Sequence, residues 1–177
     1  MAITLYDVSV TSFLQTLGAV AGFLEKGRAF LLETGKDPDA FVETQLHGDM
    51  LPFRFQVVSV AHHSRGAIEG CQAGVFRPPP ASDGLKYADL QGRVAEAIAA
   101  LKALTPEAVN ALEGRDMVFQ LGERQLPFTA ENFLLSFSLP NLHFHATTAY
   151  DILRQAGAPL GKRDYMGQMR MKLAPVT

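Results

Sequence analysis

The sequence lacks the residues that several classes of protein require. It has one cysteine, Cys71, in 177 residues, which excludes an internal disulfide bond and any metal site built on several thiolates. It also lacks a charge surplus of either sign, because 16 basic and 18 acidic residues leave a net charge of −2. A protein that binds nucleic acid needs basic side chains to neutralise phosphates. We therefore expect no nucleic-acid partner.

We expect neither a targeting segment nor a membrane span. Residues 1–5 contain no basic side chain, and no apolar run is followed by a cleavage site of small residues. The apolar stretches are interrupted by Glu25, Lys26 and Arg28, so none reaches the roughly 18 uncharged residues that a membrane span requires. We expect a cytoplasmic protein with no membrane association, and the lone cysteine agrees with that location.

The composition is that of a folded, globular chain. Apolar residues make up 47% of the sequence and charged residues 19%, which is enough apolar material for a core and excludes disorder. The length fits a single domain. We expect one domain over residues 1–177, with residues 160–177 as its tail.

Apolar residues recur at three- and four-residue steps in four long segments, a spacing typical of helices with one buried face. Two further segments begin with an N-cap residue followed by proline, Asp37-Pro38 and Thr105-Pro106, and predict short helices. The expected long helices cover residues 5–34, 52–72, 87–104 and 129–156.

The segments between these helices predict loops and a small β-hairpin. Residues 76–84 include three consecutive prolines and predict an extended loop, whereas residues 116–121 and 124–128 predict a small β-hairpin. Pro140 lies inside the last helix, which we expect to kink or break there. The predicted fold class is all-α: a bundle of four long helices with short extra helices and a small hairpin before the last helix.

Two of the five histidines are candidates for an interior site. On a regular helical wheel, His63 lies on the flank of the second long helix in a row of small and polar residues, whereas His62 lies opposite the apolar face. On the last helix, His145 lies at the edge of the apolar face beside Asn141 and points away from His143. We expect His145 to be the most buried histidine.

A metal site in a bundle takes ligands from facing helices, which makes His63 and His145 the candidate pair. Such a site needs a third ligand, for which Asp7 and Asp49 are candidates by their places near helix starts. Residues adjacent on a helix, such as His62 and His63, are poor joint ligands. The alternative is purely structural, because a buried imidazole can satisfy both nitrogens with side chains.

Two segments carry a resemblance to a known family: LPNLHFHATTAYDILR at residues 139–154 and GKRDYMG at residues 161–167. Together with residues 5–7 and 49–53, they resemble the signature of a bacterial and fungal domain-of-unknown-function family. That family is placed in the DinB/YfiT-like metalloenzyme superfamily. The resemblance covers most of the chain and brings no assigned activity with it.

The resemblance implies a DinB/YfiT-like four-helix bundle, usually a homodimer, with a divalent metal such as nickel, zinc or manganese on three histidines. One of these ligands comes from the second helix, where His63 or His62 matches, and the wheel favours His63. The other two form an HxxxH pair on the last helix, where this sequence has Asn141 and His145. Asparagine is a weaker metal ligand than histidine, so the chain departs from the family pattern here.

Two functions from different classes follow. The first is a metal-dependent enzyme acting on a small, thiol-containing substrate, since some members of the superfamily transfer or isomerise thiols. The second is a non-catalytic bundle that binds a small ligand or forms a dimer, with a degenerate metal site. A complete set of three histidines would favour the enzyme, and the asparagine at position 141 favours the second.

Overall fold

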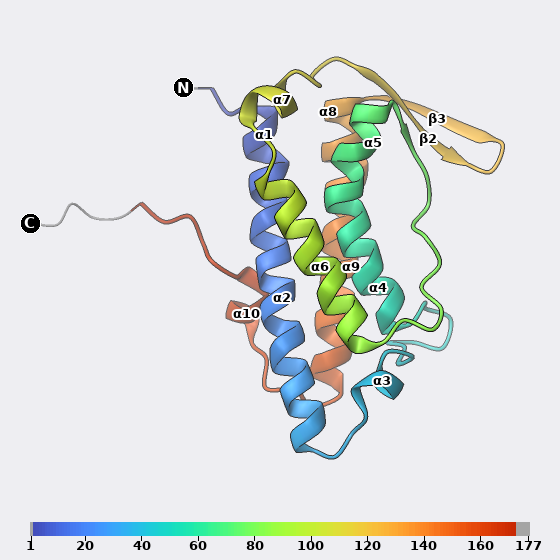
Figure 1. Ribbon diagram of the computed structural model, residues 1–177, viewed down its shortest axis with the longest axis vertical. Coiled ribbons are helices and arrows are strands. Elements are labelled where there is room, and N and C mark those ends of the chain that lie inside the picture. Colours follow the sequence, from blue (N-terminus) through green and yellow to red (C-terminus); the bar gives the residue numbers. More distant parts are fainter. Residues whose placement is uncertain (1, 173–177) are drawn as a thin grey trace, which may run out of the picture.

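The structure is a computed structural model, and it describes residues 2–172. It is mostly helical, with long helical stretches lying side by side (Figure 1). The elements in chain order are α1 (Leu5–Val8), α2 (Val10–Glu33), α3 (Pro38–Phe41), α4 (Phe53–Ala61), the π-helical segment η1 (His62–Gly66), α5 (Ala67–Ala73), β1 (Val75–Phe76), α6 (Tyr87–Lys102), α7 (Pro106–Asn110), β2 (Asp116–Leu121), β3 (Arg124–Thr129), α8 (Ala130–Asn132), the π-helical segment η2 (Phe133–Ser138), α9 (Leu139–Gln155) and α10 (Lys162–Met166).

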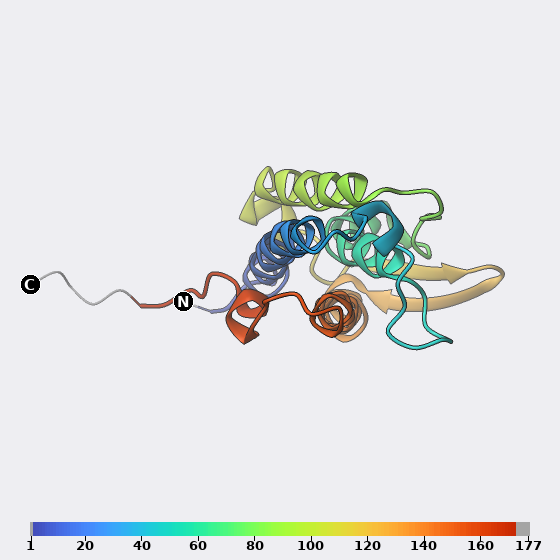
Figure 2. The same cartoon turned by 90° about the horizontal axis from the view of Figure 1, so that it is seen from below.

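The long helices enclose one apolar core. Helix α2 packs against α6 and α9, and α4 packs against the same two helices, so the four surround a common interior (Figure 2). Phe13, Phe23 and Phe53 are completely buried there. Tyr87 is also buried, and its hydroxyl donates to the carbonyl of Leu24 at 2.8 Å. The polar end of this large side chain is thereby satisfied inside the core.

The small sheet has three strands, one more than the sequence predicts. Strands β2 and β3 form the expected antiparallel hairpin, which projects from one end of the molecule (Figure 1). Strand β1 pairs in parallel with β2, with Val75 opposite Val118. The first residue of the predicted extended loop, Phe76, therefore belongs to the sheet. A strand of two residues is too short to give a periodic signal in the sequence.

The predicted ends of the long helices are confirmed where glycine follows them. Gly35 and Gly74 have φ angles of 70° and 75°, which is the left-handed conformation that ends a helix. The first long helix is interrupted at Ser9, whose hydroxyl donates to the carbonyl of Leu5 at 2.6 Å. The second begins at Phe53, with Pro52 as its N-cap.

Two of the long helical stretches each contain a π-helical segment. One joins α4 to α5, and the other joins α8 to α9 directly before Pro140. Of the expected kink or break at Pro140, the structure contradicts the break: helix α9 continues through this residue, because the wider turn before it accommodates a residue without an N–H group. The side chain of Asn141 donates to the carbonyl of Phe137 at 2.7 Å and satisfies a backbone acceptor of this turn.

The expected tail contains a further short helix. Helix α10 packs against α2, where Lys26 pairs with Asp164 at 2.5 Å. Residues 173–177 of the predicted tail lie outside the described residues, as does Met1. One stretch, Leu5–Glu33, is long and apolar enough by length and composition to cross a membrane, and 50% of the tested window is buried inside the molecule. A buried core helix gives the same values, so this is weak evidence for a membrane span.

Candidate metal centre

The structure brings His63 and His145 together from two facing helices. Their ring centroids lie 5.8 Å apart, and the ring planes are inclined by only 16°. His63 is the second residue of η1, and His145 lies in the middle of α9. The packing of α4 and η1 against α9 therefore places the two imidazoles predicted from the sequence side by side.

His63 is the more buried of the two. Only 5% of its surface is exposed, whereas His145 is half-buried. The expectation that His145 would be the most buried histidine was therefore wrong. That expectation assumed regular helices, and the π-helical turn at His63 changes the direction in which the side chains around it point. The Nδ1 atom of His63 lies 3.2 Å from the hydroxyl oxygen of Ser138.

His145 is held by a buried amide. Its Nδ1 atom lies 2.7 Å from the Oε1 atom of Gln56, a residue with 2% of its surface exposed. The other end of that amide donates to the carbonyl of Leu51 at 2.7 Å. The rings of Phe55 and Phe144 contact the imidazole edge-on, with centroids 5.8 and 5.2 Å away. Two aromatic rings therefore flank the imidazole of His145.

Burial keeps both imidazoles uncharged at neutral pH. Loss of hydration, together with the neighbouring His62 and His145, lowers the pKa of His63 to about 3. Burial likewise lowers the pKa of His145 to about 4. A metal ligand must be the neutral imidazole, so both rings are in the protonation state that a metal requires.

The other predicted site residues lie apart from this pair or only beside it. His62 directly precedes His63 in η1, but its ring stacks on that of Phe76, with centroids 4.3 Å apart. Its Nε2 atom lies 2.7 Å from the carbonyl oxygen of Arg77. Asn141 is one turn before His145 and half-buried, with its amide nitrogen bound to the carbonyl of Phe137. Within residues 2–172, no hydrogen bond engages the amide oxygen of Asn141.

The two candidate carboxylates are engaged elsewhere. Asp7 accepts hydrogen bonds from the backbone and side chain of Thr4 at 3.0 and 2.7 Å, as part of a helix cap. Asp49 is exposed and pairs with His47 at 2.6 Å. Neither is brought to the histidine pair, so the third ligand expected from these positions is not found there.

Comparison with known proteins gives the chain a family. The profile described as Domain of unknown function (DUF1993) matches residues 5–166. The chain belongs to the DUF1993 family. A crystal structure described as a DinB family member protein from Shewanella denitrificans is 26% identical, with a TM-score of 0.79 and coverage of 96% of each chain. These two findings confirm the resemblance seen in residues 139–154 and 161–167. No curated protein matches the chain.

The donor set of this DUF1993 protein fits a metal only in part. Within residues 2–172, no group of three or more histidine, cysteine, aspartate or glutamate side chains could hold a metal ion. Cys71 is buried against Met117, and burial raises the pKa of its thiol to about 12, so it is not a candidate. What fits is the imidazole pair with neutral oxygen donors near it.

The buried hydroxyl of Ser59 lacks a hydrogen-bond partner among the described residues. Ser59 lies one turn after Gln56 and one turn before His63, and its Oγ atom is buried with no partner among the described residues. An unsatisfied buried hydroxyl costs about 1–3 kcal/mol. A bound water molecule would remove that cost.

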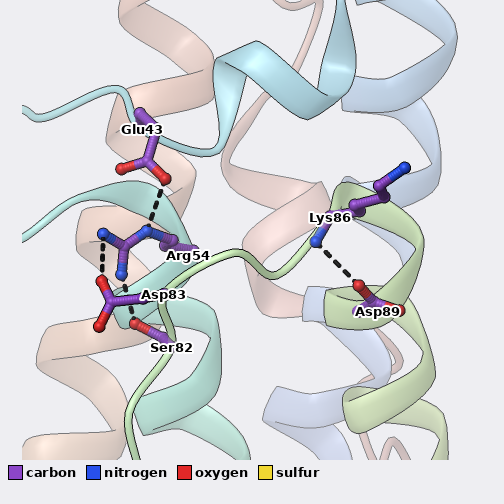
Figure 3. A network of polar contacts seen from close by, with 6 residues as sticks. All are labelled: Glu43, Arg54, Ser82, Asp83, Lys86 and Asp89. Carbon is purple, nitrogen blue, oxygen red and sulfur yellow. Dashed lines mark hydrogen bonds and ion pairs between the residues drawn. The ribbon is translucent and has the colours of Figure 1, made fainter.

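A separate polar cluster anchors the beginning of the helix that carries Gln56. Arg54 donates to Glu43 at 2.8 Å and to the hydroxyl of Ser82 at 2.7 Å, and it pairs with Asp83 at 2.9 Å (Figure 3). These contacts join the loop before α4 and the proline-rich loop to the first turn of α4. We call Glu43, Arg54, Ser82 and Asp83 the Arg54 cluster.

Sequence reasoning missed Ser138 and placed Gln56 in the right row without a role. Ser138 ends η2, and nothing in the local sequence marks a π-helical turn there. The signal for Gln56 was present, because a buried glutamine on the flank of an apolar face must find hydrogen-bond partners. Its partner lies 89 positions away in the chain, so only the structure identifies it.

Proposed function

We propose that this DUF1993 protein is a DinB-like four-helix bundle that binds one divalent metal ion on His63 and His145. The proposal rests chiefly on the paired imidazoles, which come from facing helices with centroids 5.8 Å apart. Each ring uses Nδ1 in a hydrogen bond, and no hydrogen bond within residues 2–172 engages either Nε2. Two neutral imidazoles with unused nitrogens are a typical partial ligand set for zinc or nickel.

The remaining coordination positions would go to neutral oxygen donors and to the substrate. The amide oxygen of Asn141, one turn from His145, is the candidate among the residues near the pair. The ion would serve as a Lewis acid toward water or a thiol-containing small molecule. With no more than two histidines and an amide as protein ligands, the site would hold nickel, zinc or manganese less tightly than three histidines would.

The side chains around the pair would give a substrate an apolar approach. Phe55 and Phe144 contact His145, and Phe137 lies 5.8 Å from His63. Aromatic rings exclude water from the imidazoles and strengthen electrostatic interactions at the site. A small thiol-containing molecule with an apolar body is the substrate class that agrees both with these rings and with the superfamily.

The alternative is a non-catalytic bundle that binds a small ligand or forms a dimer. It is favoured by Asn141, which stands where the family pattern has histidine. In that case His145 and Gln56 form a polar contact that specifies how α4 and α9 pack. We also propose that the protein is cytoplasmic and forms a homodimer. Light scattering at micromolar concentration measures the molar mass and so tests the homodimer. A monomeric mass would contradict the homodimer.

Elemental analysis tests the metal proposal directly. The protein is purified without a tag or chelator, and the metal content is measured before and after incubation with nickel, zinc or manganese. We expect near-stoichiometric metal in the wild type and at least a 100-fold weaker affinity in His63→Ala and His145→Ala. His143→Ala is the matched control, because His143 is exposed on the same helix. Absence of metal from the wild type after incubation would contradict the metal site and favour the non-catalytic bundle.

A further inference from the structure

The direction of the Gln56 amide determines which nitrogen of His145 carries a hydrogen. Its Nε2 atom donates to the carbonyl of Leu51, so the atom that faces Nδ1 of His145 is the oxygen Oε1. A flipped amide would place two acceptors against each other at Leu51. An amide oxygen can only accept. Nδ1 of His145 is therefore the protonated nitrogen, and the lone pair of the ring is on Nε2.

Ser138 gives His63 the same tautomer by another route. Its hydroxyl donates to the backbone carbonyl of His63 at 3.2 Å, and its oxygen lies 3.2 Å from Nδ1 of the same residue. A carbonyl oxygen can only accept, and a hydroxyl has a single hydrogen, so both contacts are hydrogen bonds together only when the hydroxyl accepts from the imidazole. Nδ1 of His63 thus carries a hydrogen, and again the lone pair is on Nε2.

The two π-helical segments meet at this contact. His63 is in η1, and Ser138 is the last residue of η2, 75 positions later in the chain. Single π-helical turns occur frequently at functional sites. Here they bring a hydroxyl from one helix to both the backbone and the ring of a residue on the other.

We propose that Gln56 and Ser138 are positioning residues that hold both imidazoles as the Nδ1–H tautomer and so leave both Nε2 lone pairs for one divalent cation. The assignment of the tautomers stands by itself, whereas its consequence for metal affinity rests on the proposed function. Hydrogen-bond partners of metal-binding histidines usually contribute 10- to 100-fold to metal affinity.

Nuclear magnetic resonance of the metal-free protein tests the tautomers. With ¹⁵N-labelled histidine, the ring nitrogens report directly which of them carries the hydrogen. We expect Nδ1–H for both His63 and His145 in the wild type. In Gln56→Leu we expect His145 to lose this fixed tautomer while His63 keeps it, and in Ser138→Ala we expect the converse.

Two variants serve as controls. In Gln56→Glu a neutral carboxyl group can donate to Leu51 as the amide does and accept from Nδ1 of His145, so His145 should keep the Nδ1–H tautomer. Gln45→Leu removes an amide from the loop before α4, where it donates to the carbonyl of Met50 at 2.5 Å and forms no hydrogen bond with a histidine among the described residues. We expect both histidines of Gln45→Leu to match the wild type.

Zinc titration provides the second measurement. The dissociation constant should rise about 10- to 100-fold in Gln56→Leu and stay unchanged in Gln45→Leu. An Nε2–H tautomer of either ring in the wild type, or an unchanged His145 in Gln56→Leu, would overturn the assignment. The expected tautomers without any zinc binding by the wild type would support the positioning contacts and refute the metal function. If Gln56→Leu fails to fold, Ser138→Ala and the wild-type spectrum still decide the outcome.

Discussion

The histidine pair and the Arg54 cluster lie close together in the sequence but are stabilised by opposite kinds of contact. Arg54 and Gln56 share the first turns of α4, and His63 follows in η1. The histidine pair is held by an amide and a hydroxyl, all of them uncharged. The Arg54 cluster is held by charges, with Glu43 and Asp83 side chains 57% and 82% exposed.

The difference follows from access to water. A charge inside the core would lose its hydration, so the interior contacts of a protein are neutral wherever the pKa of the group permits it. At the surface, water screens the carboxylates, and Arg54 can pair with two of them at little cost. This contrast predicts that acid will disturb the histidine pair and that loss of one cation will disturb the cluster.

The largest effect should come from acid acting on the metal-free protein. Burial depresses the pKa values of His63 and His145 to about 3 and about 4 in the folded state, against about 6.5 in the unfolded chain. Below pH 6.5 the unfolded state binds more protons, so the free energy of unfolding falls as the pH decreases toward 4 and then 3. We expect a loss on the order of a few kcal/mol.

Urea denaturation from pH 7.5 to 4 measures this loss. The double variant His63→Gln/His145→Gln is the control, because it cannot bind the two extra protons in the unfolded state and should show a flatter dependence. Equal slopes for the wild type and the double variant would contradict the depressed pKa values.

Removal of the Arg54 charge should have the next largest effect. Arg54→Met keeps most of the apolar stem but leaves the hydroxyl of Ser82, a residue only 3% exposed, without its donor. We expect a loss of about 2 kcal/mol in the free energy of unfolding, with zinc affinity unchanged. The double variant Arg54→Met/Ser82→Ala should recover part of the loss. A change below about 0.5 kcal/mol in Arg54→Met would show that the cluster contributes no more than an exposed ion pair.

The smallest effect should come from His62, the neighbour of His63. Its ring stacks on Phe76 and its Nε2 atom contacts the carbonyl of Arg77, away from His145. We expect His62→Ala to lower the free energy of unfolding by about 1 kcal/mol and to leave the metal content unchanged. Loss of metal from this variant, measured by elemental analysis, would show that His62 is a metal ligand like His63.

The long helices and the hairpin could be predicted because their signals are local. Apolar spacing gives the buried faces, and the glycines at positions 35 and 74 end two helices where they were expected to. The π-helical turns could not be predicted, because they depend on how two helices pack. For that reason the regular helical wheel selected His145 as the most buried histidine, although His63 is more buried. The same turns explain why the helix continues through Pro140, where a kink or a break was expected.

The sequence by itself determined the helical elements, the neutral composition and the histidines worth considering, because spacing, caps and net charge act over short distances or over the whole chain. Only the tertiary structure decided how those histidines are used. The contacts from Gln56 to His145 and from His63 to Ser138 span 89 and 75 positions. Such contacts exist only once the helices have packed, because hydrogen bonds over these separations require the backbone of both helices to be in place.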